Sequence, residues 1–234
     1  MAALLLMAIA ALVVSACGSS AKTQTSAGGA SGSGTTSSSS GGGASGGTIN
    51  MVEGVYPQSL DPGYDYTTQG AEVNWLVYTG LTTYKHTSGT ASGQLIPGLA
   101  TGMPKISNGG LTYTVTLRKG LKYSDGKPVK ASDFTFAFER AVKIPWGGSG
   151  QFMTPVVKGA AAYAAGKAKT ISGIQTNDAT GKIVIHLTHP YGAFDNVLAE
   201  PALGLIPAGS APFKNDPLHP PPGCGPYMVK NITV

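Results

Sequence analysis

The stretch that decides the fold is LTYTVTLRKGLKYSDGKPVKASDFTFAFER, residues 111–140. Its first part alternates apolar with polar side chains, which is the two-residue period of a strand with one buried face. The apolar positions are Leu111, Tyr113, Val115 and Leu117. Asp125-Gly126 then supplies a residue that tolerates positive φ, and Pro128 fixes its own φ. The chain therefore turns tightly after this strand.

The second part of the same stretch has the period of a helix. Four apolar residues fall at i, i+3, i+4 and i+7, which places them on one helical face: Phe134, Ala137, Phe138 and Ala141. Asp133 lies in the first turn, where a negative charge meets the positive end of the helix dipole. The stretch predicts a strand, a tight structural corner and a helix that packs back onto the sheet, with no chemistry required of Asp125.

The chain opens with an uncharged apolar segment, residues 1–16, followed by Cys17. This segment is shorter than the about 20 residues of a transmembrane helix, so it predicts a secretory signal rather than a membrane span. The small residues that precede Cys17 resemble the lipobox of bacterial lipoproteins, in which cleavage leaves a lipidated cysteine at the new N-terminus. We predict a signal peptide with a lipobox over residues 1–17 and lipidation of Cys17. An ordinary signal peptide with a coincidental cysteine is the alternative.

Residues 18–47 consist of Gly, Ser, Thr and Ala, interrupted only by Lys22 and Gln24. Such a segment cannot bury enough apolar surface to offset its ordering entropy. A flexible linker of this length has an r.m.s. reach of about 30 Å. We predict a tether that holds a domain clear of a lipid surface, and a disordered tail without that role is the alternative.

The remaining residues, 48–234, are enough for a core of one to two domains. The whole chain has 16 Lys and Arg against 11 Asp and Glu, a formal net charge of +5. Because these basic residues are scattered rather than clustered, the sequence predicts no nucleic-acid partner. Cys17 and Cys224 are the only cysteines. If Cys17 carries lipid, no disulfide can form within the chain and the fold must depend on packing.

Patterns linked to catalysis or metal binding carry little weight in this sequence. Gly43–Gly47 matches G-x-S-x-G and Gly41–Gly46 matches G-x-G-x-x-G, but both lie in the tether, where no strand precedes them. His186 and His189 lie three apart on a predicted strand, so their side chains point to opposite faces and cannot chelate one metal. With no catalytic constellation, the sequence predicts neither an enzyme nor a cofactor.

Six segments, read in order, carry a resemblance to one family. They are QSLDP at 58–62, VYTGL at 77–81, LIPGLATG at 95–102, the stretch 111–140, KIVIHLTHPYGAFDNVLAEPALGLIP at 182–207 and GCGPYMVK at 223–230. In this order they resemble the solute-binding receptors of bacterial ABC importers of the dipeptide, oligopeptide and nickel type, extracellular solute-binding protein family 5. The segments span most of residues 48–234.

The resemblance implies a mixed α/β (α+β) fold of the type II periplasmic-binding-protein class. Residues 48–234 would form the N-terminal lobe, with an outer subdomain over roughly 77–189 in the numbering of this chain. Family members run to more than twice this length and have a second lobe. We therefore expect an N-terminal fragment that stops before the second lobe.

The resemblance also implies a function. Receptors of this type capture a ligand between two closing lobes and deliver it to the permease subunits of an ABC transporter. We expect a lipid-anchored receptor for peptides or a related small solute at the outer face of the bacterial cytoplasmic membrane. An adhesion or signalling lipoprotein on the same scaffold is the alternative. Peptide, nickel chelate, haem and sugar all remain open as ligands.

In this family the segment just before SLDP reaches the ligand cleft, so we expect an opening strand over residues 48–57 that contacts ligand. The expected ligand-binding residues are Glu53, Gly54, Val55 and Tyr56. Glu53 would pair with a ligand ammonium group, and Tyr56 would offer a flat apolar face with a hydroxyl. Equally, Glu53 fits a solvated charge and Tyr56 a packing residue. Trp146, in a loop rich in Gly and Pro, is either a further contact or a loop anchor.

Two positions depart from the family pattern. Lys130 stands where the family often has a threonine N-cap, and lysine offers no acceptor for the free N–H groups of a helix. We therefore expect the cap to pass to Ser132. Cys224 replaces the usual threonine of GTGPY, and we expect a small buried thiol rather than a reactive one.

Overall fold

The structure is a computed structural model that describes residues 46–144, 148–214 and 216–233. The chain divides into two compact units, Met1–Ile49 and Asn50–Val234. Of the first unit only residues 46–49 are described, and they form neither helix nor strand. The predicted signal peptide with Cys17 and most of the predicted tether lie outside the described residues, as does Trp146.

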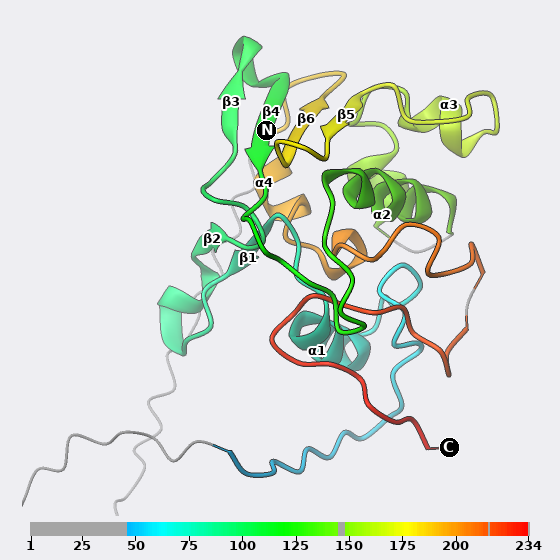
Figure 1. Ribbon diagram of the computed structural model, residues 1–234. Helices are drawn as coiled ribbons and strands as arrows, with labels where there is room; N and C mark the ends of the chain where they lie inside the picture. Colours follow the sequence, from blue (N-terminus) through cyan, green and yellow to red (C-terminus); the bar gives the residue numbers. More distant parts are fainter. Residues whose placement is uncertain (1–45, 145–147, 215, 234) are drawn as a thin grey trace, which may run out of the picture. The chain divides into compact units, whose positions relative to one another are not determined.

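The second unit contains a four-stranded antiparallel sheet in the order β3-β4-β6-β5 (Figure 1). Tyr113 pairs with Ile185 and Val115 pairs with Ile183, and all four side chains are buried. The alternation of residues 111–117 therefore forms a strand with one buried face, as predicted. The strands are β3 (Lys105–Ser107), β4 (Thr112–Thr116), β5 (Ile174–Asn177) and β6 (Lys182–His186).

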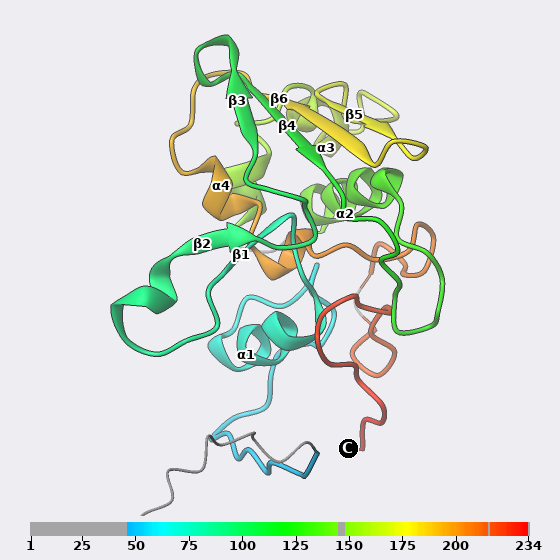
Figure 2. The same cartoon turned by 60° about the vertical axis from the view of Figure 1, so that its left-hand side comes forward.

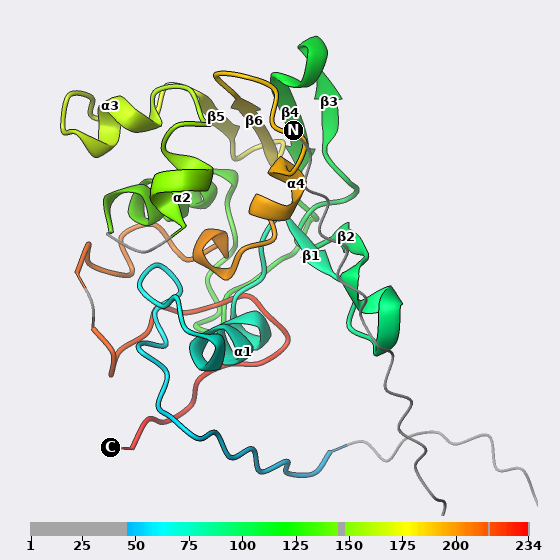
Figure 3. The ribbon, with the colours of Figure 1, turned by 180° about the vertical axis from the view of Figure 1, so that it is seen from behind.

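Helix α2 (Ala131–Lys143) packs its predicted apolar face against this sheet. Phe134, Phe138 and Ala141 are fully buried, and the rings of the two phenylalanines lie 5.9 Å apart. Burying one such side chain stabilises a fold by about 1.5–3 kcal/mol. In Figure 2 the sheet lies at the top, α2 lies below it and helix α1 (Thr68–Val77) lies lowest. Figure 3 shows the same arrangement from behind.

The corner between β4 and α2 has the predicted geometry. Gly126 has a φ of 84°, and its N–H donates to the Tyr123 carbonyl at 2.9 Å. The Asp125 carboxylate accepts from the Lys127 N–H at 3.1 Å and forms an ion pair with the Lys127 ammonium at 2.9 Å. These contacts are local to the turn, which confirms the prediction of a structural corner.

The start of α2 differs from the prediction, because Ser132 is not its cap. The helix begins after Lys130, whose N–H donates to the Asp133 carboxylate at 2.9 Å. Ser132 instead donates from its N–H and its hydroxyl to the Asp178 carboxylate, at 2.8 and 2.9 Å. A carboxylate 46 residues away thus satisfies the free N–H that a local cap would have satisfied.

A second sheet and several short helices connect these elements. Strands β1 (Thr82–Tyr84) and β2 (Leu95–Pro97) pair antiparallel. The short helices are α3 (Ala160–Ala164), α4 (Phe194–Val197), η1 (Gly89–Gly93), η2 (Asn108–Gly110), η3 (Ser149–Met153) and η4 (Pro201–Leu203). None of the helices in the described part of the chain combines the length and the apolar character that crossing a bilayer demands.

The chain between α4 and η4 crosses the start of β1 closely. The Thr82 N–H donates to the Leu198 carbonyl at 3.4 Å, and the Leu205 N–H donates to the Thr79 carbonyl at 3.3 Å. A Cβ atom at Gly80 would collide with the Leu198 carbonyl oxygen, so glycine permits this approach. The crossing places η4 beside α1.

Residues 221–227 run along the C-terminal end of α1. The Gly225 N–H donates to the Val77 carbonyl at 2.8 Å, and the Tyr227 N–H donates to the Leu76 carbonyl at 3.0 Å. These two carbonyls belong to the last turn of the helix, which has no intrahelical donors for them. The GCGPY segment therefore completes the hydrogen bonding of α1, and Figure 1 shows it in red beside that helix.

The opening strand predicted over residues 48–57 is wrong. This segment forms no strand, and Val52 and Tyr56 are 95% and 88% exposed. A strand needs a neighbour to satisfy its backbone N–H and C=O groups. No strand of the described part of the chain pairs with residues 48–57.

Candidate functional site

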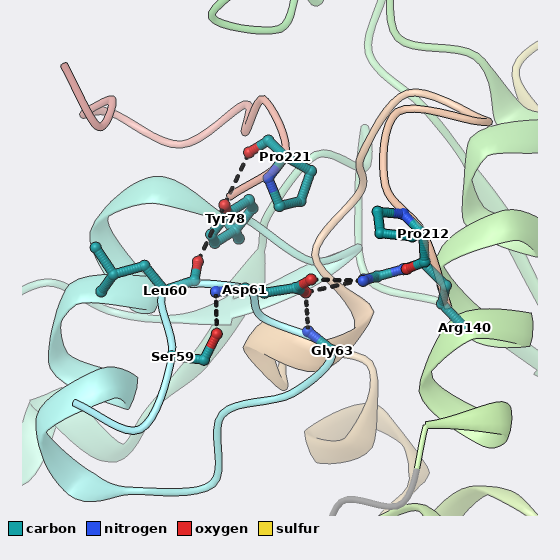
Figure 4. Close-up of polar contacts among 8 residues, drawn as sticks. All are labelled: Ser59, Leu60, Asp61, Gly63, Tyr78, Arg140, Pro212 and Pro221. Carbon is teal, nitrogen blue, oxygen red and sulfur yellow. Dashed lines mark hydrogen bonds and ion pairs between the residues drawn. The ribbon is translucent and has the colours of Figure 1, made fainter. Parts of the chain in front are cut away.

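The SLDP motif folds into a buried, fully paired corner (Figure 4). The Asp61 carboxylate accepts from Arg140 Nη1 at 2.9 Å and from Nη2 at 2.5 Å, and both side chains are almost inaccessible. The Gly63 N–H donates to the same carboxylate at 3.0 Å, and Arg140 Nε donates to the Pro212 carbonyl at 2.9 Å. Every charged group therefore has its partners, so this corner is structural rather than a ligand site.

Tyr78 connects the same corner to a distant part of the chain. Its hydroxyl lies 3.2 Å from the Leu60 carbonyl and 2.8 Å from the Pro221 carbonyl, and it donates to them (Figure 4). Burial raises the pKa of this hydroxyl well above its usual range, and the nearby Asp61 charge adds to the shift. Tyr78 is therefore a neutral donor that holds loops together.

Polar groups also gather at the N-terminal end of α1. Thr67 is the N-cap, and its hydroxyl accepts from the Gly70 N–H at 3.1 Å. The same hydroxyl donates to the Asp65 carboxylate at 2.8 Å. A Cβ atom at Gly70 would overlap this carboxylate, so the glycine provides the space that Asp65 occupies. Asp65 thus lies at the positive end of the helix, where an anion is stabilised.

Beside this helix end lies a pocket of about 210 Å³, which we name the α1–η4 pocket. Its polar lining includes Asp65, Thr67, Thr68, Asn74 and Glu200. The Asn74 side chain is 1% exposed, and its Oδ1 accepts no hydrogen bond in the described structure. A buried polar atom without a partner is rare in native proteins and calls for a physical explanation.

Glu200, the residue just before η4, is the second unusual group of the α1–η4 pocket. Burial raises the pKa of its carboxyl, because the ionised form loses hydration. No described residue donates a hydrogen bond to this carboxylate. The pocket therefore holds two acceptors that are free to receive a donor, the buried Oδ1 of Asn74 and the half-buried carboxylate of Glu200.

The sequence-predicted site residues lie together in a different hollow. Glu53, Gly54, Val55 and Tyr56 line a groove of about 450 Å³, which we name the α1 groove, together with residues 72, 73 and 76 of α1. Loss of hydration and the Glu72 carboxylate raise the pKa of Glu53. Val55 and Tyr56 are 59% and 88% exposed, so the groove is shallow.

The two hollows open on opposite sides of α1. Residues 72, 73 and 76 border the α1 groove, whereas residues 68, 71 and 74 border the α1–η4 pocket. At about 100° per residue, the centres of these two sets differ by about half a turn. The helix itself therefore separates the site predicted from the sequence from the pocket with the free buried acceptors.

Sequence reasoning missed Asp65, Asn74 and Glu200. One signal was present, because Asn74 lies on the buried stripe of α1 between Gly70 and Val77, at i+4 and i−3. An asparagine on a buried helical stripe indicates either a hydrogen-bonded core residue or a site. Glu200 had no comparable signal, because only the crossing of its segment over β1 brings it near α1.

The histidines and Cys224 have structural surroundings. His186 Nδ1 lies 3.3 Å from the Thr112 hydroxyl, and His189 Nδ1 lies 2.9 Å from the hydroxyl of its neighbour, residue 188. The described residues contain no group of three or more His, Cys, Asp or Glu side chains placed to hold a metal. Burial raises the pKa of the Cys224 thiol to about 12, which agrees with the expected unreactive thiol.

A family model of the bacterial extracellular solute-binding proteins, family 5, matches residues 94–234, more than half of the chain. The chain belongs to this family. The resemblance read from the sequence is therefore confirmed, and the family consists of binding proteins.

Family 5 relatives support the same assignment. The chain is 31% identical over 146 residues to the oligopeptide-binding protein OppA of Bacillus subtilis, covering 62% of this chain and 26% of that protein. It is 32% identical over 155 residues to the probable deoxycholate-binding periplasmic protein YgiS of Escherichia coli, covering 64% and 28%. The chain thus spans about a quarter of the length of these relatives.

A solved structure of a family 5 relative has the same fold. The clavulanic acid biosynthesis oligopeptide binding protein 2 superposes with a TM-score of 0.67 at 28% sequence identity. The match covers 76% of this chain and 32% of that protein. The mixed α/β fold of the type II periplasmic-binding-protein class is therefore confirmed.

Proposed function

We propose that this chain forms part of an extracytoplasmic receptor that captures peptides, or a related small solute, and delivers them to an ABC transporter. Capture by closure of two lobes, and attachment to the outer face of the cytoplasmic membrane through lipid on Cys17, belong to the same proposal. Membership of the solute-binding family supports the receptor role. The observation that supports a ligand contact in this chain is the side chain of Asn74. Its Oδ1 is a buried acceptor without a donor, and the residue lines an open pocket.

The energetics of that acceptor favour a binding role. A buried acceptor left without a partner costs about 1–3 kcal/mol. A ligand that donates to Asn74 Oδ1 recovers this free energy when it binds. Water competes weakly for this atom, because Asn74 is only 1% exposed. In a protein that binds no ligand, the unpaired acceptor would only lower the stability of the fold.

The names of the relatives offer two ligand classes. The Bacillus subtilis protein is named for oligopeptides, and the Escherichia coli protein is named for deoxycholate. A peptide has many N–H donors along its backbone, whereas deoxycholate has two hydroxyl donors and a carboxylate that would meet the carboxylates of Asp65 and Glu200 in the same lining. The repulsion between these like charges therefore favours a peptide over deoxycholate.

Titration calorimetry on the protein as its host produces it tests this function. A pool of short peptides and, in parallel, deoxycholate serve as ligands at neutral pH. We expect peptide binding with a Kd near or below about 1 μM, which corresponds to about −8 kcal/mol. If the wild-type protein binds neither ligand and deletion of the gene leaves peptide uptake unchanged, the receptor role is wrong.

Variants on either side of α1 decide which hollow holds the ligand. Asn74→Leu removes the free acceptor of the α1–η4 pocket, and we expect it to weaken peptide binding. Glu53→Gln and Tyr56→Ala remove the contacts proposed from the sequence in the α1 groove. Loss of binding in these two variants, with Asn74→Leu unaffected, would place the ligand in the groove.

The proposed lipid anchor has a separate test. Cys17→Ser should move the protein from the membrane fraction to the soluble fraction, because serine cannot form the thioether to lipid. Radiolabelled palmitate should enter the wild-type protein and be absent from the variant. Unchanged fractionation together with no label in the wild type would contradict the anchor.

A further inference from the structure

The four-stranded sheet has a second face, which points away from α2. Alternate residues of each strand point to it, because successive side chains of a strand leave opposite faces. We name this the outer sheet face and define it by every second residue of the four strands, counted from Lys105, Thr112, Gln175 and Lys182. Of these residues only Thr112 is buried. The outer sheet face is therefore open over most of its area.

Lysines supply the fixed charges of this face. Lys105 and Lys182 both belong to the outward residues, and both are exposed. No residue of the outer sheet face is Asp or Glu. Neither lysine forms an ion pair with a described residue. The face thus has a positive charge that nothing in the described part of the chain neutralises.

A third lysine extends the positive charge to the edge of the face. Val157 pairs with Leu187, and both side chains are buried. The next residue, Lys158, therefore points to the outer side beside His186, whose carbonyl accepts from the Lys158 N–H at 2.9 Å. Lys158 is exposed, and it too has no ion pair within the described ranges.

Carboxylates of neighbouring elements are held on the α2 side of the sheet. Asp178, in the turn between β5 and β6, accepts from the N–H and the hydroxyl of Ser132 at the start of α2. Glu139 of α2 accepts from the Thr170 hydroxyl at 2.6 Å. Helix α2 packs on the buried face of the sheet, so these two charges do not balance the lysines of the outer sheet face.

The three lysines are widely spaced. Strands lie about 4.8 Å apart and rise about 3.4 Å per residue, so the registers place the Cα atoms of Lys105, Lys158 and Lys182 about 12–16 Å from one another. Side chains stand roughly perpendicular to a sheet, so this spacing does not focus three ammonium groups on one small anion. It fits a partner that repeats its negative charge over an extended surface.

The outer sheet face also lacks the side chains that stabilise protein interfaces. Val184 is the only apolar residue among its outward positions, and none of them is Phe, Tyr or Trp. The buried core of a protein–protein interface is enriched in aromatic residues and Met. A planar anionic surface needs no such core, because it attracts basic residues electrostatically. The composition of the face therefore favours a lipid surface over an acidic protein.

We propose that the outer sheet face binds the anionic headgroup surface of a lipid bilayer through Lys105, Lys158 and Lys182. Each basic residue near such a surface strengthens binding about fivefold. Three such residues give a weak attraction, which becomes effective on a protein that a tether already holds at a high local concentration. The inference goes beyond the proposed function, because capture of a solute does not require it.

Sedimentation with lipid vesicles tests this attraction. The full chain is used with Cys17→Ser, so that no lipid anchor can hold it on the vesicles. One set of vesicles contains phosphatidylcholine alone, and the other contains equal parts of phosphatidylcholine and phosphatidylglycerol. Partition is measured at an ionic strength of about 0.01 M, where the Debye length is about 30 Å, and at about 1 M, where it is about 3 Å.

The expected result is a preference for the anionic vesicles. At low ionic strength the partition coefficient should be about a hundredfold higher on the anionic vesicles than on the neutral ones, from three factors of about five. The preference should disappear at high ionic strength. Each single change, Lys105→Gln, Lys158→Gln or Lys182→Gln, should lower it about fivefold, and the triple variant should abolish it.

A second triple variant is the matched control. Lys85→Gln/Lys214→Gln/Lys230→Gln removes the same number of positive charges from exposed positions outside the outer sheet face. It should retain most of the preference for anionic vesicles. Equal loss of preference in the two triple variants would show that net charge, rather than this face, attracts the protein, and would overturn the inference.

Two further results would also overturn it. Equal partition onto neutral and anionic vesicles at low ionic strength would show that the face does not bind headgroups. Binding to beads that carry polyglutamate, without binding to anionic vesicles, would show that the partner is an acidic polypeptide. Peptide binding by calorimetry should be the same with and without the triple change in the face. Failure of this inference is thus distinguishable from failure of the proposed function.

Discussion

Two carboxylates in this protein, the buried Asp61 and the half-buried Glu200, have opposite surroundings. Asp61 accepts hydrogen bonds from the Arg140 guanidinium and from the Gly63 N–H, and it is 1% exposed. Glu200 borders the α1–η4 pocket and receives no hydrogen bond from a described residue. The comparison teaches that burial of a charge alone does not indicate function. A paired charge stabilises loops, whereas an unpaired one beside a pocket is available to a ligand.

The largest effect is expected where the paired carboxylate loses its cation. Arg140→Leu leaves Asp61 buried without its counter-charge, and removing one partner of a buried pair costs about 3–5 kcal/mol. Chemical denaturation should show this loss in the free energy of unfolding. The double variant Asp61→Leu/Arg140→Leu is the control, because an apolar pair should recover most of the loss. A single variant as stable as wild type would contradict the structural role of the pair.

A smaller loss is expected at the corner between β4 and α2. Gly126→Val should destabilise the protein by about 1–3 kcal/mol, because a β-branched residue resists a φ of 84°. No atom lies within 4 Å of the added Cβ, so the effect reports backbone strain alone. Gly102→Val is the matched control, because Gly102 also has open space and lacks a positive φ. Equal melting temperatures of the two variants would argue against strain.

Asp133 is another buried carboxylate with hydrogen-bond partners, so it tests how much a single donor contributes to the stability of a paired carboxylate. It accepts from the Tyr123 hydroxyl at 2.8 Å, and from the N–H groups of Lys130 and Ala208. Tyr123→Phe removes one of these donors, so we expect a loss of about 0.5–1.5 kcal/mol in the free energy of unfolding. A loss as large as that of Arg140→Leu would mean that this carboxylate depends on the single hydroxyl.

The unpaired carboxylate should give the smallest change in stability, with the opposite sign. Burial raises the pKa of Glu200 above its ordinary value of 4.5. Below pH 4.5 the carboxyl is protonated in the folded and the unfolded chain alike. As the pH rises further, the unfolded chain ionises first, so the folded wild type loses stability until the pH has passed the raised pKa.

Glu200→Gln removes this loss, because glutamine does not ionise. Its melting temperature in the absence of ligand should exceed that of wild type at neutral pH, and the difference should vanish below pH 4.5. Glu139→Gln serves as the control, because Glu139 lines neither hollow and glutamine can still accept from the Thr170 hydroxyl, 2.6 Å away. A variant that is less stable than wild type at neutral pH would show that Glu200 has a stabilising partner.

Much of the fold followed from local patterns in the sequence. The alternation in β4, the apolar face of α2 and the Asp125-Gly126 turn depend on residues a few positions apart, and each formed as predicted. The cap of α2 did not, because its acceptor is Asp178, far along the chain. The opening strand failed for a similar reason, since alternating residues form a strand only where a second strand pairs with them.

The α1–η4 pocket was beyond local reasoning for the same physical cause. Asn74 and Glu200 lie 126 positions apart and meet because the chain crosses β1 next to Gly80. The predicted residues 53–56 did gather around one hollow, which remains a proposed ligand surface. Comparison with a family motif identifies a segment of the chain that is expected to contact ligand. Which polar atoms of that region have hydrogen-bond partners can be seen only in the three-dimensional structure.

The contacts between α1 and residues 221–227 also have a consequence for the order in which the protein folds. The Tyr78 hydroxyl and the Pro221 carbonyl are separated by 143 positions in the chain. Contacts of such separation cost much loop-closure entropy before they add stability, so they form late and slowly. During synthesis, the sheet and α2 can assemble from residues 105–186, while the last turn of α1 must wait for residue 227. We therefore expect the last turn of α1 to become ordered after the sheet and α2.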